Sequence, residues 1–151
     1  LRQTVKIRRA QGEDAPALTT LIYMSKQSNG YDDAFMAACA EELRVTPTRI
    51  DETFFLLAEE PPGTPLGCAC LTSDGEIETF FIHPDHKRRG IGRALWEALK
   101  RQAQAQKLTR LTLDAEPAAV AFYRAIGFDV IAEVPSGSIP GRYLPQMALT
   151  L

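Results

Sequence analysis

Three short strand-like runs in the middle of the chain constrain its fold more than any other feature. They cover residues 53–59, 66–72 and 76–82, and each is rich in aliphatic and aromatic side chains. Pro61-Pro62-Gly63 separates the first two runs, and Ser73-Asp74-Gly75 separates the last two. Short connections made of such turn-forming residues join neighbouring antiparallel strands. The sequence therefore predicts an antiparallel β-meander at the centre of the molecule.

Helical and strand-like segments on both sides of the meander complete the pattern. We expect a strand over 4–9, helices over 13–25 and 32–43 and a turn over 46–52 before it, and after it a helix over 90–105, a strand over 108–114, a helix over 117–126 and strands over 128–134 and 143–150. A chain of 151 residues has the size of one domain, so residues 1–151 are treated as a single domain. This order predicts an α+β fold, an α/β sandwich with one mixed, mostly antiparallel central sheet of about seven strands and helices on both faces.

The composition is that of an ordinary soluble globular protein. Hydrophobic residues make up 45% of the chain and charged residues 24%, which excludes disordered and fibrous classes. The apolar runs are far shorter than the roughly 20 residues of a membrane-spanning helix, and no secretory signal is visible. We therefore expect a cytoplasmic protein without a membrane partner. Cys39, Cys68 and Cys70 lack the spacing of metal ligands, and we expect reduced thiols that pack in the core and no bound metal.

The stretch from Ile82 to Leu95 has the pattern of an anion site. It contains the end of a strand, a turn with basic residues, Gly90-Ile91-Gly92 and the start of a helix. Glycines let the backbone approach a ligand closely, and the first N–H groups of a helix point outward at the positive end of its dipole. A pyrophosphate would fit there. The stretch is not the dinucleotide fingerprint, because Leu95 takes the place of its third small residue, and it lacks the Gly-Lys-Ser/Thr of a Walker loop.

Together with a second motif, this stretch resembles the GNAT superfamily of N-acetyltransferases. Residues 119–128, Ala-Val-Ala-Phe-Tyr-Arg-Ala-Ile-Gly-Phe, are similar to the A-x-x-F-Y-x-x-x-G-F helix and strand of that family. Two motifs in this order are more specific than either one alone. Two positions depart from the family pattern: Lys87 stands where the glycine-loop motif has Gln or Arg, and Glu116 stands where many members have Asn.

The resemblance implies that acetyl-CoA is a co-substrate. Its pyrophosphate would lie on the backbone of residues 88–94, and its pantetheine arm would pair with the backbone of residues 80–82. A backbone N–H of that strand would stabilise the oxyanion. The expected cofactor-binding residues are Phe80, Phe81, Ile82, Lys87, Arg88, Arg89, Gly90, Ile91, Gly92, Arg93, Ala94 and Tyr123.

Three residues are candidates for catalytic groups. The resemblance implies that Tyr123 is the general acid that protonates the departing coenzyme A thiolate; packing in the core is the alternative. A lysine-like amine, with a pKa of about 10.4, must lose a proton before it attacks, and Glu76 and Glu78 are the candidates for the base. Alternation along the strand predicts that both glutamates share one face, so the sequence does not choose between them, and both have solvated surface roles as the alternative. We assign His83 and His86 to the turn after the strand.

These features favour an N-acetyltransferase that transfers the acetyl group from acetyl-CoA to a primary amine by direct attack in a ternary complex. A non-catalytic acyl-CoA-binding or sensing module of the same fold is the alternative. No nucleic-acid partner is expected, because the glycine-punctuated basic stretch suits phosphate cradling better than groove reading. The acceptor, a small-molecule or peptide amine, stays unidentified, although the acidic excess over residues 11–60 favours a cation. Segment 135–145 either borders the acceptor site or is a stiff connection, and a homodimer is a further expectation.

Overall fold

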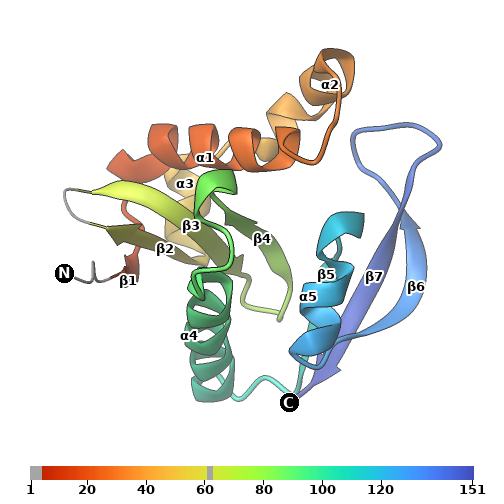
Figure 1. Cartoon of the computed structure of the whole chain (residues 1–151). Coiled ribbons are helices and arrows are strands. Elements are labelled where there is room, and N and C mark those ends of the chain that lie inside the picture. Colours follow the sequence, from red (N-terminus) through yellow and green to blue (C-terminus); the bar gives the residue numbers. More distant parts are fainter. Residues whose placement is uncertain (1–4, 61–62) are drawn as a thin grey trace.

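The computed structural model describes residues 5–60 and 63–151, so Thr4, Pro61 and Pro62 of the expected strand and turn lie outside the described residues. In chain order the elements are β1 (Lys6–Arg9), η1 (Gly12–Asp14), α1 (Ala15–Gln27), α2 (Asp33–Leu43), α3 (Pro47–Glu52), β2 (Phe54–Glu60), β3 (Thr64–Leu71), β4 (Ile77–Ile82), η2 (Pro84–His86), α4 (Ile91–Ala105), β5 (Arg110–Asp114), η3 (Pro117–Ala119), α5 (Val120–Ala125), β6 (Asp129–Pro135) and β7 (Tyr143–Thr150) (Figure 1). The three η elements are single 3₁₀ turns.

The first four strands form an antiparallel sheet in the order β1-β2-β3-β4. β2 pairs with β3 from Phe54 opposite Leu71 onward, and β3 pairs with β4 from Gly67 opposite Ile82 onward. The predicted β-meander is therefore confirmed. It leaves β4 as the edge strand of this sheet.

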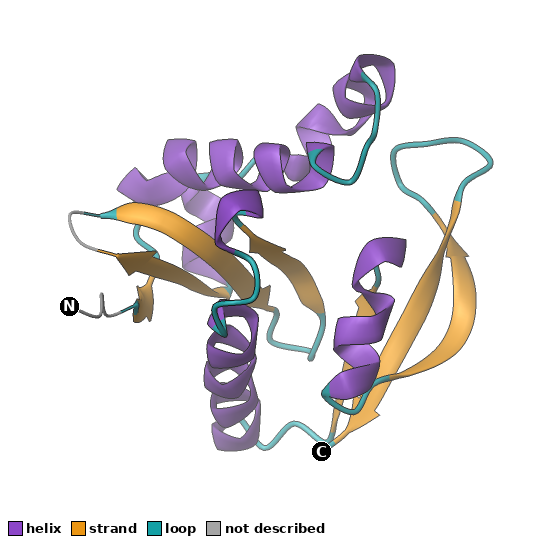
Figure 2. Ribbon diagram, viewed as in Figure 1, coloured by secondary structure: helices purple, strands orange, loops and turns teal. Residues whose placement is uncertain are grey.

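The last three strands form a second antiparallel sheet in the order β5-β7-β6. Within the described residues, one isolated parallel bridge, Glu76 to Thr112, joins this sheet to the first. Beyond the bridge the two groups of strands diverge toward the top of the view in Figure 2. The α+β fold class with seven strands is confirmed, but the expected single sheet is two hydrogen-bonded sheets, because β4 and β5 separate soon after they meet.

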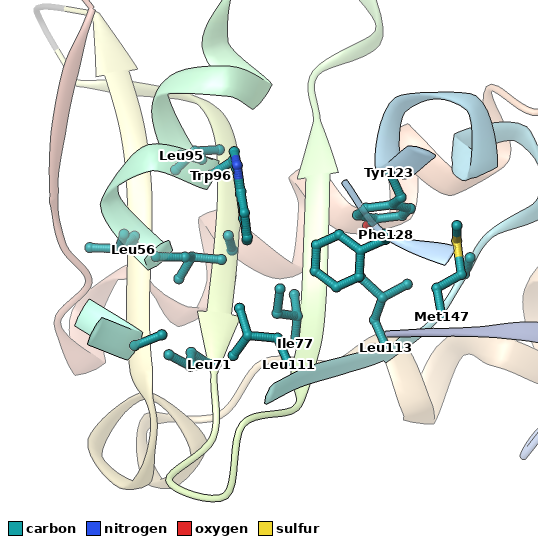
Figure 3. Close-up of a cluster of buried hydrophobic side chains, with 14 of the residues drawn as sticks. Leu56, Leu71, Ile77, Leu95, Trp96, Leu111, Leu113, Tyr123, Phe128 and Met147 are labelled. Carbon is teal, nitrogen blue, oxygen red and sulfur yellow. The ribbon is translucent and has the colours of Figure 1, made fainter. Parts of the chain in front are cut away.

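Helices cover both faces of the first sheet, as expected. Phe55 and Leu57 of β2 pack with residues of α1, α2 and α3, whereas Leu56 and Ala58 point to the opposite face and pack with residues of α4 and α5. This alternation is what a strand buried on both faces produces. Figure 3 shows the second of these clusters, which continues into the second sheet, where Phe128 lies against Trp96 of α4 with 5.4 Å between the ring centroids.

Helix α4 shows why the sequence folds as it does at this position. Ile91, Leu95, Leu99 and Ala103 follow one another at four-residue intervals and are all buried. Side chains four residues apart lie on one face of a helix, so this spacing produces an apolar stripe that covers the sheet.

One expected element is wrong in type. The segment predicted as a turn over 46–52 contains helix α3. The Thr46 hydroxyl accepts the backbone N–H of Arg49 at 3.1 Å, Pro47 takes the first helical position, and the side chain of Ile50 is buried in the core. A threonine cap followed by proline is a helix-start signal, so the residues for this helix were present in the sequence.

The expectation for the cysteines is confirmed, since Cys39, Cys68 and Cys70 are all buried free thiols. Burial raises the pKa of both the Cys68 and the Cys70 thiol. A further finding concerns membranes: over residues 5–60 and 63–151, none of the helices combines the length and apolar character that a bilayer crossing needs.

Candidate active site

The site begins at an irregularity in β4. Cys70 pairs with Thr79 and Leu71 pairs with Ile77, so Glu78 is the extra residue of a β-bulge. The bulge breaks the side-chain alternation: Ile77 joins the same core cluster as Phe80, although the two lie an odd number of positions apart. Bulges bend a strand and re-aim its side chains. The bulge changes the register at Glu78, and Glu76 and Glu78 nevertheless line one cavity.

A cavity of about 450 Å³ opens where β4 diverges from β5, and we call it the glycine-loop cavity. Its lining combines the end of β4, the glycine loop, the start of α4 and one side of α5. The lining residues are Ser25, Asn29, Phe80, Phe81, Ile82, His86, Lys87, Arg88, Gly90, Ile91, Gly92, Arg93, Glu116, Ala118, Ala119, Phe122 and Tyr123. Ten of the twelve residues expected to bind the cofactor thus line one cavity.

The glycine loop presents unpaired backbone N–H groups to this cavity. Arg88 and Gly90 adopt left-handed backbone conformations, with φ of 65° and 79°. Within the described part of the chain, the backbone N–H groups from Lys87 to Arg93 donate no hydrogen bond. Successive N–H groups at a turn and a helix start form a concave site for an anion.

Two residues of the expected cofactor set lie outside the lining, and their contacts give the reason. The backbone N–H of Ala94 is used inside the helix, where it donates to the Gly90 carbonyl at 3.0 Å. The Arg89 guanidinium is bound to the Glu60 carboxylate at 2.5 Å and lies 2.8 Å from His86 Nδ1. His83 caps η2, because its Nδ1 accepts the backbone N–H of Asp85 at 3.1 Å.

Tyr123 is one of the lining residues of the glycine-loop cavity. Its ring is surrounded by Phe80, Phe122 and Phe128, with centroid distances of 6.0, 5.5 and 5.9 Å, and only 6% of the residue is exposed. Burial, with a smaller effect of the Glu116 charge, raises the pKa of Tyr123 well above its ordinary value. Tyr123 therefore stays protonated at neutral pH. Among the described residues its hydroxyl has no hydrogen-bond partner.

A second cavity, of about 370 Å³, is lined by residues of β4 and by Asp114 at the end of β5, and we call it the acidic cavity. Glu76, Glu78 and Asp114 line it together with residues of α1, α2 and the β6–β7 loop. Desolvation raises the pKa of the Glu76 carboxyl, and the nearby charges of Glu78 and Asp114 raise it further. Desolvation, with the charge of Glu42, likewise raises the pKa of Asp114. The negative charges of Glu76 and Asp114 are therefore not fully stabilised by the surrounding protein.

The two cavities share the lining residues Phe81 and Glu116. Glu116 binds Lys26, with 3.0 Å between Nζ and Oε2, and also accepts the hydroxyl of Tyr31. Arg142 of the β6–β7 loop donates to the Tyr31 hydroxyl at 2.6 Å. Lys26, Tyr31 and Arg142 did not emerge as site residues from the sequence, because 85 residues separate Tyr31 from Glu116 and 111 separate it from Arg142. The departure of Glu116 from the family's Asn was the one available signal.

Solved structures share this architecture over the whole chain. A GCN5-related N-acetyltransferase from Rhodopseudomonas palustris superposes with a TM-score of 0.80 at 23% identity, covering 100% of this chain and 99% of that one. An N-acetyltransferase from Thermoplasma acidophilum, solved in complex with coenzyme A, superposes with a TM-score of 0.79 at 17% identity and covers 98% of this chain and 99% of that one. The chain therefore has the fold of the GCN5-related N-acetyltransferases.

The sequence comparison agrees with the fold. Residues 21–147 match the model of the acetyltransferase (GNAT) domain family, and the chain belongs to that family. It is 31% identical to a mycothiol acetyltransferase of Clavibacter sepedonicus over 128 residues, which cover 83% of this chain and 41% of that protein. It is 36% identical to the uncharacterized N-acetyltransferase ycf52 of Porphyra purpurea over 67 residues, which cover 42% of this chain and 38% of that protein. The chain thus spans about two fifths of the length of these relatives.

Proposed function

We propose that this chain is an acetyl-CoA-dependent N-acetyltransferase that acetylates a primary amine by direct attack in a ternary complex. The observation that supports it most is the unpaired edge of β4, which leads directly into the run of free backbone N–H groups from Lys87 to Arg93. An edge strand offers hydrogen-bonding groups to the amide-rich pantetheine arm, and the loop offers them to the pyrophosphate. Family membership and the Thermoplasma acidophilum complex with coenzyme A point to the same ligand.

The two cavities suit the two substrates. The thioester would lie near Tyr123 in the glycine-loop cavity, and the amine would enter from the acidic cavity, which shares the lining residues Phe81 and Glu116 with it. Carboxylates at Glu76, Glu78 and Asp114 favour a cationic acceptor. Direct attack requires no enzyme nucleophile, and burial keeps the Cys68 and Cys70 thiols protonated.

The chemistry requires one bond to form, one bond to break and several proton transfers. A base removes a proton from the ammonium group, the amine nitrogen attacks the thioester carbonyl carbon, and an N–H on the β4 edge stabilises the oxyanion. The C–S bond then breaks as the carbonyl re-forms, and the sulfur takes a proton from Tyr123. The attacking nitrogen still carries one proton more than the amide product, and it gives this proton up to solvent, which returns one to the tyrosinate, so that a neutral amide, the coenzyme A thiol and the Tyr123 hydroxyl remain. An ordinary tyrosine is about 1.5 pKa units weaker as an acid than a thiol, so full transfer costs about 2 kcal/mol or more. Because burial raises the pKa of Tyr123, the proton must move while the C–S bond breaks rather than after it.

The base is tested by exchanging each glutamate for glutamine. We expect Glu76→Gln to lower kcat/KM by about tenfold or more and to remove the acid limb of the pH–rate profile. In the native enzyme the rate falls as pH drops through the carboxyl pKa, and for Glu76 this fall lies above the ordinary carboxyl range because its pKa is raised. Glu78→Gln is the matched variant on the same strand. A profile unchanged in both variants would remove both residues as the base.

Thermal melting gives this experiment an internal control. A raised carboxyl pKa means that ionisation of the carboxyl is less favourable in the folded state than in the unfolded state. The ionised carboxyl therefore destabilises the fold at pH values above the folded-state pKa, and this destabilisation disappears as the pH falls through that pKa. The neutral glutamine avoids this cost, and we expect Glu76→Gln to melt no lower than the native protein at pH 7. Loss of activity with a lower melting temperature would instead indicate structural damage.

The proposed function itself is tested by measuring free coenzyme A release from acetyl-CoA across a panel of amines. Diamines, amino acids, peptide N-termini and lysine peptides cover the acceptor classes. Amine-dependent release is the expected result. Tight acetyl-CoA binding without release by any amine would favour a non-catalytic acyl-CoA-binding module.

A further inference from the structure

We propose that Glu116 is a positioning residue that holds the donor and acceptor sides of the molecule together. Its carboxylate would seat two separate segments, the α1–α2 connection and the β6–β7 loop, over the junction of the two cavities. The inference rests on the proposed function insofar as it takes the glycine-loop cavity as the donor site and the acidic cavity as the acceptor site.

The position of Glu116 is the first observation. It lies two residues after the end of β5, its side chain is 16% exposed, and it lines both cavities. A carboxylate at such a junction faces each substrate site from one side. A change in what it holds therefore affects the opening between them.

The contacts of the carboxylate are the second observation. Four polar side chains surround it: Lys26 at 3.0 Å, Asn29 at 3.5 Å, the Tyr31 hydroxyl, and Arg142 at 3.7 Å. Lys26 belongs to α1, Asn29 and Tyr31 belong to the α1–α2 connection, and Arg142 belongs to the β6–β7 loop. One residue thus contacts both acceptor-side segments.

Charge explains why these contacts depend on Glu116. Lys26 and Arg142 are 11% and 18% exposed in their side chains, and one carboxylate faces both cations. Desolvation and the hydrogen bond to Glu116 raise the pKa of Tyr31 to about 12, so the tyrosine adds no charge of its own. Removing one partner of a buried ion pair leaves the other charge uncompensated, which is costly. Without the Glu116 charge, Lys26 and Arg142 would repel each other.

Aromatic packing makes the arrangement a shared unit. The rings of Tyr31 and Phe35 stack with 4.0 Å between centroids, and the Arg142 guanidinium lies over both rings at 5.2 and 4.9 Å. The β6–β7 loop also contacts helix α2, through the hydrogen bond from the Ser138 hydroxyl to Glu42. Releasing Arg142 would therefore remove the hydrogen bond by which the β6–β7 loop contacts Tyr31 of the α1–α2 connection.

The test is Glu116→Gln, which keeps the shape of the side chain and removes its charge. Hydrogen exchange can be measured without knowing the acceptor amine. We expect the backbone amides of residues 28–32 and 136–142 to exchange about tenfold faster in this variant, with the exchange of the β2 and β3 amides unchanged. Glu59→Gln is the control: Glu59 is also 16% exposed and bound to an arginine, Arg8, but it lies away from both cavities. Unchanged exchange in both segments of Glu116→Gln would overturn the proposal.

Kinetics with an amine from the panel provide the second measurement. For Glu116→Gln we expect the KM for the amine to rise about tenfold, kcat to change less than about threefold, and the acetyl-CoA dissociation constant to change less than about twofold. A weakened acetyl-CoA affinity with an unchanged KM for the amine would overturn the proposal, because Glu116 would then be a donor-binding residue. If the native protein acetylates no amine, the proposed function fails, and the exchange data still decide whether Glu116 seats the two segments.

A second variant covers the case in which Glu116→Gln does not fold. Tyr31→Phe keeps the stack on Phe35 and removes the hydroxyl that joins Glu116 to Arg142. We expect the same two segments to exchange faster, by a smaller factor. Where the double variant Glu116→Gln/Tyr31→Phe folds, its exchange rates should rise by less than the product of the two single increases, because both substitutions act through one network. Multiplying effects would contradict a shared unit.

Discussion

Replacing Tyr123 by Phe will lower kcat by about 100-fold or more, while acetyl-CoA binding stays the same. The substitution removes only the hydroxyl, so the ring keeps its contacts with Phe80, Phe122 and Phe128. Because the hydroxyl has no hydrogen-bond partner among the described residues, the variant should melt at or slightly above the native temperature. Steady-state kinetics, calorimetry with acetyl-CoA and thermal melting together separate the general-acid role from packing.

The control for this change is Tyr23→Phe, which removes a hydroxyl from a tyrosine that packs at the edge of the other core cluster. Its kcat should stay within about twofold of the native value. Full activity of Tyr123→Phe would mean that water protonates the thiolate and that Tyr123 serves only in packing. A dissociation constant for acetyl-CoA that rises along with the loss of kcat would show damage to the binding cavity.

Replacing Gly90 by Val will weaken acetyl-CoA binding by about tenfold to 100-fold. A β-carbon added at Gly90 would meet no atom of the chain within 4 Å, so the added side chain enters open space beside the loop. That space is where we place the pyrophosphate. Losing one charge-assisted hydrogen bond, worth about 1.5–3 kcal/mol, corresponds to this loss of affinity.

Backbone strain must be separated from this effect, because Gly90 has a φ of +79° that a β-branched residue adopts only at a cost. Gly141 provides a matched control, since it has the same φ of +79° and a β-carbon added there would also meet no atom within 4 Å. We expect Gly90→Val and Gly141→Val to lose similar stability, and only the first to lose acetyl-CoA affinity in calorimetry. Equal affinity losses, or none in Gly90→Val, would remove the pyrophosphate from this loop.

The regular part of the fold could be predicted because it depends on local patterns. The four-residue spacing of Ile91, Leu95 and Leu99 defines the buried face of α4, and the turn chemistry around Ser73-Asp74-Gly75 defines the meander. The division into two sheets could not be predicted in this way. It depends on where β4 and β5 separate after the bridge from Glu76 to Thr112, and that point is set by packing between distant segments.

The same distinction holds for the site. The glycine loop was visible in the sequence, because its glycines and basic residues are adjacent in the chain. The bulge at Glu78 was not visible, since it is defined by the register with Cys70 and Leu71 on the neighbouring strand. Nothing in the sequence separated Arg89 and Ala94 from their neighbours. In the structure the Arg89 guanidinium binds the Glu60 carboxylate, and the Ala94 N–H donates to the Gly90 carbonyl. Hydrogen-bond partners, distant for Arg89 and local for Ala94, therefore decide which members of the motif are free to bind.

The central claim, direct acetyl transfer to an amine, is tested most directly by mass spectrometry with acetyl-CoA that carries ¹³C in its acetyl group. With an amine from the panel, we predict that the labelled acetyl group appears on the amine in a quantity equal to the coenzyme A released. Without the amine, the protein itself should gain no label, because its cysteines are buried and the attack needs no enzyme nucleophile. Stoichiometric labelling of the protein before amine is added, followed by its transfer to the amine, would contradict direct attack, and coenzyme A release without any labelled amine would contradict acetyl transfer altogether.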